Sequence, residues 1–400
     1  MIQHKVSCPV LLLSILVAAF ANTATITQVF LSFHIGFSGS VMTTLYAGTV
    51  LCIGVISYFY YKKLGIRVNR SNALIAIMLL LYFLFTRIVL GAPNIEFQYF
   101  FVFCICSLLI PSITVIDNRI FFRTSVLCAA PTFFASNTIF MLDYNGELNM
   151  GMSYALLMPA VMTIVYLKYF WNSERKKIKF VMLALSILSL YSVLMVFQNG
   201  SRGVVICIFF LILFMQVVRI DGHMITVNKK KLFIYFVIMI IVVSSYQLVF
   251  LLINNFLASY DTNFHFIDKI LNLSTSGDIS NGRNDLYTLT IKGIWESPLI
   301  GHGLDRFDAN TRHGYPHNFI LQLAYDMGVP ITIYILVKIY KMLKRTFEYN
   351  NETDFLLVWA LFFASVPGAL FSDNLWNNRA LWLFLGFLFV VNKTNSVRRW

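Results

Sequence analysis

The sequence has few charged residues and few cysteines. Only 12% of its 400 residues are Asp, Glu, Lys or Arg, about half the share of roughly 25% found in soluble domains. This excludes an ordinary water-exposed surface. All six cysteines lie in or beside apolar runs, so no disulfide framework is indicated. Cys104 and Cys106 are too closely spaced for a zinc knuckle and lack nearby His or Cys partners, so we expect no metal site there.

Apolar and aromatic residues dominate the chain instead. Hydrophobic residues make up 58% of it, the mean hydropathy is +0.73, and there are 38 Phe and 20 Tyr residues. These rings supply bulk that faces lipid and anchors at the membrane surface. The composition therefore predicts an integral membrane protein and not the two or three soluble domains that the length alone would suggest.

The apolar runs predict about twelve membrane helices. A helix needs roughly 20 mostly apolar residues to cross a bilayer, and the runs lack the short alternating pattern of membrane strands. We expect an all-α, polytopic helix bundle with one long extracytoplasmic loop. The expected spans are 9–33, 41–61, 72–90, 97–116, 120–142, 152–171, 178–197, 203–220, 232–256, 317–340, 354–372 and 379–392.

The basic residues predict how these helices are oriented. Loops rich in Lys and Arg stay in the cytoplasm, and with the N-terminus inside, 23 of the 31 basic residues fall on the inner side. We therefore expect both termini to be cytoplasmic. Acidic residues outnumber the eight outer basic residues, so the net charge of +13 does not indicate a surface for nucleic acid. Lys5 and the following apolar stretch also resemble a secretory signal, but the stretch continues to about Phe33, which favours a retained helix.

One long polar segment, residues 257–316, separates the helices of 1–256 from those of 317–400. Within it, residues 284–296 predict a short helix with an apolar stripe that lies in the membrane interface; the stripe comprises Tyr287, Ile291, Ile294 and Trp295. Ser280 or Asn281 would cap this helix and place Arg283 in its first turn, where free backbone N–H groups suit a phosphate. Pro316 restricts the backbone before His317 and Asn318, which open the next helix.

Four short motifs on the outer side carry a family resemblance. They are Asn199–Gly203 (Asn-Gly-Ser-Arg-Gly), Asn281–Arg283 (Asn-Gly-Arg), Ser297–Gly303, and His317-Asn318 followed by Gly328. In this order and spacing, residues from roughly 195 to 335 resemble the O-antigen polymerase and O-antigen ligase group. These are membrane glycosyltransferases of the bacterial inner membrane, with the active site on the periplasmic face.

The resemblance implies a reaction without a metal or other cofactor. An acceptor sugar hydroxyl attacks the anomeric carbon of a sugar chain and displaces polyprenyl diphosphate. Carried over by motif, Arg202 and Arg283 bind the diphosphate and His317 is the general base, because a neutral imidazole can accept a proton near pH 7. The expected partners are an undecaprenyl-diphosphate-linked oligosaccharide, membrane lipid, a chain-length regulator protein and a flippase, with no nucleic acid.

Other residues are candidates for binding substrate. His302 and Arg306 match the family less firmly, and Asn318 follows the histidine. Arg379 closes the last outer loop, as a phosphate or sugar contact or as a salt-bridge partner of Asp373. Asp326 is the only acid inside an apolar run, where a carboxylate is either functional or paired with a neighbouring helix.

Alternatives remain for both the residues and the function. Arg202 could be an interfacial anchor, Arg283 a solvated loop charge, and His317 a structural loop residue. We favour a polymerase because residues 316–319 and 373–378 look more like polymerase members; the alternative is a ligase that moves finished chains to the lipid A core. A flippase for the same lipid-linked sugar would also have about twelve helices, but apart from Asp326 the sequence lacks the midplane charges and related halves usual in transporters, and the asymmetric outer loop argues against one.

Overall fold

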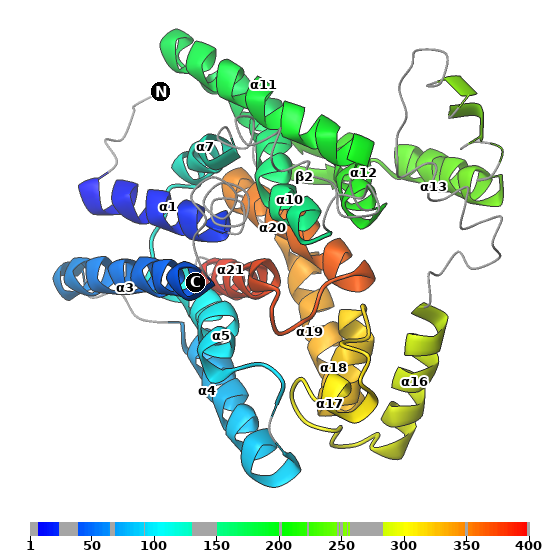
Figure 1. Cartoon of the computed structure of the whole chain (residues 1–400). Helices are drawn as coiled ribbons and strands as arrows, with labels where there is room; N and C mark the ends of the chain where they lie inside the picture. The colour runs from blue at the N-terminus through cyan, green and yellow to red at the C-terminus, as the bar shows by residue number, and fades with distance from the viewer. Residues whose placement is uncertain are drawn as a thin grey trace.

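The computed structural model describes residues 7–23, 39–64, 69–91, 93–129, 150–199, 202–221, 224–245, 283–348 and 351–397, with 248, 251–253 and 255–256. These residues are almost all helical, as the sequence predicts (Figure 1). The first half contains α1 (Cys8–Ala21), α3 (Gly39–Leu64), α4 (Arg70–Phe85), η2 (Thr86–Leu90), α5 (Phe97–Phe100), η3 (Phe101–Cys106), α6 (Ser107–Ile113), α7 (Asn118–Ala129), α10 (Met150–Val165), η4 (Tyr166–Phe170), η5 (Trp171–Ser173) and α11 (Lys176–Asn199). The second half contains α12 (Arg202–Val217), β1 (Val218–Asp221), β2 (Met224–Val227), α13 (Lys229–Ser244), α16 (Arg283–Glu296), α17 (Phe307–Thr311), α18 (Phe319–Met327), α19 (Val329–Thr346), α20 (Glu352–Phe371) and α21 (Arg379–Val397).

Helices α20 and α21 form the centre of the bundle. They pack against each other, α20 also contacts α10 and α12, and α21 contacts α6. Phe355 and Leu361 of α20 and Phe384 and Leu388 of α21 are fully buried. A helix that is apolar around its whole circumference belongs inside such a bundle. These two helices position the segment that joins them, residues 372–378, at one end of the core.

Other helices expose broad apolar faces. On α4, Leu81 is 60% exposed, and on α13 Phe233 is 67% exposed, with further apolar side chains beside each. Patches of this kind are rare on soluble proteins and suit contact with lipid. Within the described ranges, two helices are long and apolar enough to cross a membrane alone, Arg70–Leu90 and Glu352–Phe371, and six shorter apolar helices accompany them. The expected number of twelve spans therefore stays a prediction.

Two expected spans have a different form. The tenth span, 317–340, is broken into α18 and α19 at Gly328, whose φ of +85° lies in the left-handed region. The new helix begins at Val329, with Pro330 in its first turn. The eighth span, 203–220, ends at Val217, and the chain continues as an antiparallel hairpin in which Val218 pairs with Val227. Residues 130–142 of the fifth span lie outside the described residues.

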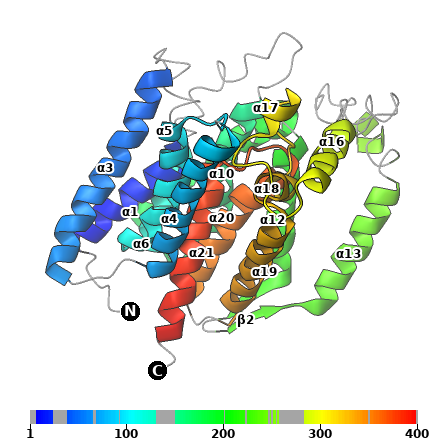
Figure 2. The ribbon, with the colours of Figure 1, turned by 90° about the horizontal axis from the view of Figure 1, so that it is seen from below.

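Helix α16 confirms the short helix expected in the long polar segment. It begins at Arg283 and ends at Glu296. Its buried residues Thr290 and Gly293 pack toward α18, whereas Trp295, on the expected apolar stripe, is 77% exposed. The expected caps Ser280 and Asn281 lie outside the described residues. Figure 2 shows α16, α17 and α18 at the end of the bundle opposite β2.

A turn over residues 297–303 fastens α16 to the C-terminal end of α18. The backbone N–H groups of His302 and Gly303 donate to the carbonyl oxygens of Tyr325 (2.8 Å) and Asp326 (3.0 Å). Gly301 has a φ of +76°, and a Cβ atom on it would overlap the carbonyl group of Asp326. The turn therefore requires glycine at this position both for its conformation and for its close approach to α18.

Replacing Gly301 by alanine should lower the thermal unfolding midpoint by clearly more than Gly314→Ala does. Gly314 is the matched control because its φ is +71° and an added Cβ would meet nothing within 4 Å. Gly314→Ala is destabilised only by placing alanine in the left-handed region, which costs about 1 kcal/mol. Gly301→Ala has the same cost and also introduces the overlap with Asp326. Thermal unfolding of both variants in detergent measures the difference, and equal shifts would contradict this account of the turn.

Candidate functional site

His317 occupies a constrained position just before α18. Its φ of +55° lies in the left-handed region, which is uncommon for residues other than glycine. The next residue, Asn318, caps the helix: its Oδ1 accepts from the N–H groups of Ile320 (3.0 Å) and Leu321 (3.2 Å). The Asn318 side chain is thus used in fixing where α18 starts. The structure gives this predicted substrate-binding residue a role in placing His317.

The imidazole of His317 is held by the segment that follows α20. Its Nδ1 lies 3.2 Å from the carbonyl oxygen of Ser372, and the hydroxyl of Tyr315 donates to the same oxygen at 2.8 Å. The Tyr315 and His317 rings are 4.2 Å apart. Because a carbonyl oxygen can only accept, Nδ1 carries the hydrogen, and Nε2 of the neutral ring keeps its lone pair. The arrangement presents Nε2 as a base.

Arg283, the first residue of α16, acts on the same group of side chains. Burial lowers the pKa of His317, the hydrogen bond to Ser372 opposes this, and the positive charge of Arg283 lowers the pKa further. Arg283 also favours the ionised form of Tyr315, although burial and Asp373 dominate there and raise that pKa to about 12. Two of the three residues predicted as catalytic, His317 and Arg283, are therefore close enough to interact electrostatically.

The N-terminus of α12 reaches the same region. Arg202 is its first residue, and the side chain of Arg202 lies outside the part of the chain that the structure describes. The next residue, Gly203, lies against Tyr154 of α10, since a Cβ on Gly203 would overlap the Tyr154 hydroxyl. Tyr154 in turn interacts electrostatically with Arg283 and Asp373. The start of α12 is thereby brought to the end of the bundle that holds His317 and Arg283.

His302 and Arg306 lie in the connection between α16 and α18. The Nε2 atom of His302 is 2.7 Å from the carbonyl oxygen of Gly293, and its ring stacks on Tyr325 at 4.4 Å. Arg306 lies against Gly91 and donates from Nη2 to Asn310 at 3.4 Å. His302 therefore joins α16 to α18. Substrate binding by either residue stays a prediction.

Asp326 is fully buried beneath this site. Its Oδ2 accepts from the indole N–H of Trp376 (2.6 Å) and from the backbone N–H of Asp305 (3.2 Å). These two hydrogen bonds join Asp326 to neighbouring segments, as the paired interpretation expects, and substrate binding by Asp326 stays a prediction. The carboxylate ties the turn at 303–306 and the segment after α20 to α18.

Sequence reasoning missed the rest of this buried network. Asp305 Oδ1 accepts from the side-chain amide of Asn374 at 3.1 Å, and the side chain of Gln322 donates to Asn374 and accepts from the N–H of Leu375. Burial raises the pKa of Asp305 to about 6. The available signal was Gln322, a second polar residue in the apolar run that contains Asp326, together with the polar run 373–378.

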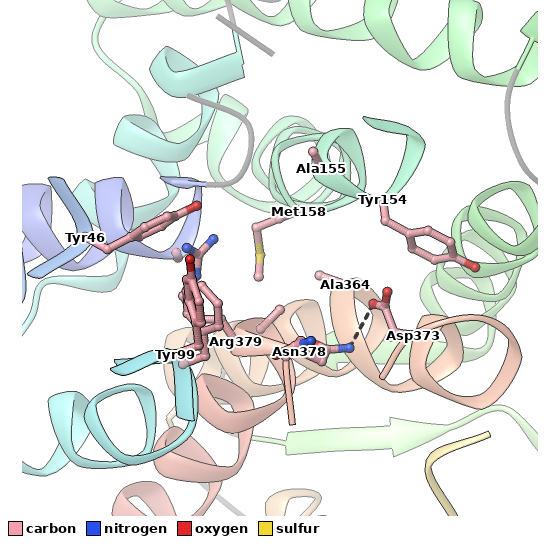
Figure 3. Close-up of a pocket in the computed structure, with 13 residues that line it drawn as sticks. Tyr46, Tyr99, Tyr154, Ala155, Met158, Ala364, Asp373, Asn378 and Arg379 are labelled. Carbon is pink, nitrogen blue, oxygen red and sulfur yellow. Dashed lines mark hydrogen bonds between the residues drawn. The ribbon is translucent and has the colours of Figure 1, made fainter. Parts of the chain in front are cut away.

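A cavity of about 440 Å³ lies beside this network (Figure 3). Tyr154, Asp373 and Arg379 are among its lining residues. Asp373 accepts from the Asn378 amide at 3.0 Å, and burial raises its pKa to about 6. The expected alternative of a salt bridge between Arg379 and Asp373 is wrong, because no ion pair joins these two residues in the described part of the chain.

Comparison with known proteins shows that the central part of the chain matches a protein family. Residues 187–336 match the model of a protein family described as O-antigen ligase, and no curated protein matches the chain. The match includes Arg202, Arg283 and His317, and ends before Arg379. It confirms the resemblance to the O-antigen ligase and polymerase family without separating the two. This family is associated with bacterial membranes and acts on lipid-linked oligosaccharides.

The pKa of His317 should lie below its ordinary value of about 6.5. Arg283→Gln should raise it, because the protonated imidazole then loses a repelling cation. Titration of the protein with ¹³C-labelled histidine, followed by NMR, measures both values, and the missing signal in His317→Asn assigns the resonance. Arg87→Gln, at an exposed position, is the control for loss of one positive charge. An unchanged pKa in R283Q would refute the proximity of the two groups.

Proposed function

Since residues 187–336 carry the domain of the O-antigen ligase and polymerase family, we propose that the protein is an O-antigen polymerase. It joins oligosaccharide repeat units carried on undecaprenyl diphosphate, at the periplasmic face of a bacterial inner membrane. The observation that supports this most is the meeting of His317 and Arg283 with the start of α12 at one end of the bundle. All three elements lie within the matched segment.

His317 is the general base of the proposed reaction. An acceptor hydroxyl oxygen forms a bond to the anomeric carbon of the donor sugar, and its proton passes to Nε2 of His317. The bond from that carbon to the diphosphate oxygen breaks, and the electron pair leaves with the polyprenyl diphosphate. The hydrogen bond from Nδ1 to Ser372 suits this role, because it fixes the tautomer whose Nε2 is free to accept.

Arginine side chains stabilise the leaving group. The diphosphate gains charge as the bond breaks, and a planar guanidinium that stays protonated can pair with two phosphate oxygens at once. Arg283 and Arg202 are the first residues of α16 and α12, where the helix dipole also favours an anion. The proposal assigns this electrostatic work to side chains and needs no cofactor.

An O-antigen ligase is the second candidate, because that is the description of the matched family. Both enzymes would use the same leaving group and the same base, and would differ in the acceptor. The polymerase is favoured by the resemblance of residues 316–319 and 373–378 to polymerase members. A flippase receives no support from the family match. A chain-length regulator and a separate flippase are proposed as partners of the polymerase.

Substitution of the three catalytic candidates should leave products with a single repeat unit. We expect His317→Asn to lower the rate by about 10² to 10⁴, the usual contribution of a general base. Asparagine is preferred to alanine here because it tolerates the left-handed backbone of His317. Arg283→Gln and Arg202→Gln should act in the same direction, whereas Arg87→Gln should leave chain length unchanged. Gel analysis of the glycan measures this, and wild-type chain lengths in all three variants would exclude the proposed site.

A deletion strain separates polymerase from ligase. Loss of a polymerase leaves single repeat units attached to the lipid A core, because the ligase of the cell still transfers them. Loss of a ligase leaves long chains that remain on the lipid carrier. We expect the first outcome, restored to long chains by the wild-type protein; unattached long chains would identify the protein as the ligase.

A further inference from the structure

We propose that the cavity beside Asp373 binds an acidic sugar residue of the substrate, and that Arg379 pairs with the carboxylate of this sugar. The proposal deepens the proposed function, on which it rests for the nature of the substrate as a lipid-linked glycan. It assigns Arg379 a part in choosing the repeat unit, separate from the diphosphate chemistry of Arg202 and Arg283.

Arg379 is a buried cation that lacks a protein counter-ion in the described part of the chain. It is only 8% exposed, and its guanidinium carbon lies 5.3 Å from the centre of the Phe20 ring and 4.9 Å from that of Tyr46. Its Nε has no hydrogen-bond partner among the described residues, and none of their carboxylates forms an ion pair with it. An isolated buried charge is costly, so this guanidinium is well prepared to bind an anion.

The rest of the cavity has the chemistry of a sugar site. Its volume of about 440 Å³ falls within the range typical of small-ligand pockets. The rings of Tyr46, Tyr99 and Tyr154 provide apolar faces, and the exposed amide of Asn377 provides a polar contact. Aromatic rings with a few placed polar groups match a sugar, which has apolar faces and a rim of hydroxyls.

The two charged groups of the cavity lie on different walls. Figure 3 shows Arg379 beside Tyr46 and Tyr99, whereas Asp373 lies on the side of Tyr154. A sugar between these walls can direct its carboxylate to Arg379 and its hydroxyls to Asp373. The negative charge of Asp373 therefore does not face the carboxylate directly.

The cavity adjoins the proposed reaction centre. Asp373 follows Ser372, whose carbonyl oxygen holds both His317 and Tyr315. Tyr154 lines the cavity and also borders Gly203 at the start of α12. A sugar bound here would lie next to the proposed base and diphosphate site. The donor sugar and the acceptor sugar must both lie there, because the new glycosidic bond joins them.

A carboxylate is favoured over a second diphosphate for two reasons. The tyrosines and amides around Arg379 match a sugar ring, whereas Arg202 and Arg283 stand at helix N-termini that suit phosphate. Arg379 also lies outside residues 187–336. A residue beyond the segment shared with the family is well placed to recognise what differs between substrates.

The test measures binding without turnover. The full-length protein in lipid nanodiscs is titrated with methyl glucuronide and methyl glucoside, which differ only in the carboxylate, and binding is followed by saturation-transfer NMR. We expect the wild type to bind the glucuronide at least about tenfold more tightly than the glucoside, because a charge-assisted hydrogen bond contributes about that much binding free energy. Arg379→Gln should remove the preference, and Arg87→Gln, with the same loss of charge at an exposed site, should keep it.

A second variant keeps the test decisive if R379Q does not fold. Asn377 lines the cavity and is exposed, so Asn377→Asp adds a negative charge without disturbing the core. It should weaken binding of the glucuronide severalfold and leave the glucoside unchanged. Equal binding of the two sugars by the wild type, a preference that survives in folded R379Q, or no effect of N377D would overturn the proposal.

Binding of inorganic pyrophosphate tests whether the anion bound in the cavity is a diphosphate instead of a sugar carboxylate. We expect its binding to survive R379Q and to be lost in Arg283→Gln. If pyrophosphate requires Arg379 instead and the glucuronide does not bind, the cavity is a diphosphate site and the assignment to an acidic sugar is wrong. Because binding is measured apart from chain length, an inactive protein that still prefers the glucuronide would contradict the proposed polymerase activity and leave this proposal standing.

Discussion

Hydrogen bonds to one buried carboxylate hold the functional end of the molecule together. Asp326 has no solvent exposure, and its Oδ2 accepts from Trp376, after α20, and from Asp305, in the turn after α16. A buried carboxylate left without donors would be strongly unfavourable, so these segments are constrained to lie against α18. The segment after α20 also contains Ser372. The turn after α16 follows the helix that begins at Arg283, so that helix is held near α18 as well. The relative position of His317 and Arg283 thus depends on this network.

This dependence explains why so little of the site is formed by neighbours in sequence. His317 is fixed by Ser372, which is 55 residues away, and Tyr154 and Gly203 come from two further helices. Each of these helices is held in the core by apolar packing around α20 and α21. The scaffold is apolar, and the candidate site residues lie where its helices begin and end. Short polar connections between rigid helices can hold such groups more accurately than one long free loop.

Local sequence patterns predicted some helices and their bounds correctly, but not the helix break, the hairpin or the long-range contacts. The bounds of α16 followed from its apolar spacing and the Ser297-Pro298 stop, and the motif spacing identified the family domain before any comparison. The break at Gly328 was not foreseen, because a single glycine in an apolar run also fits a continuous helix. Here a Cβ at this position would overlap the carbonyl group of Leu299, so the break requires glycine. The links among Asp305, Gln322 and Asn374 join residues up to 69 apart, and no local rule reports such contacts. The hairpin of β1 and β2 was missed because Val218 and Ile220 extend an apolar run that reads as helix.

The exposed indole of Trp295 has a consequence for how deep in the bilayer the chemistry takes place. Tryptophan side chains favour the headgroup level of a membrane, and α16 carries Trp295 at one end and Arg283 at the other. Because His302 joins Gly293 of this helix to Tyr325 of α18, the start of α16 at Arg283 is fixed relative to α18. In the proposed reaction, the lipid carrier keeps its diphosphate at the headgroup level while its hydrocarbon tail stays in the bilayer. The substrate can then reach the site by lateral diffusion, with no step in which the tail meets water.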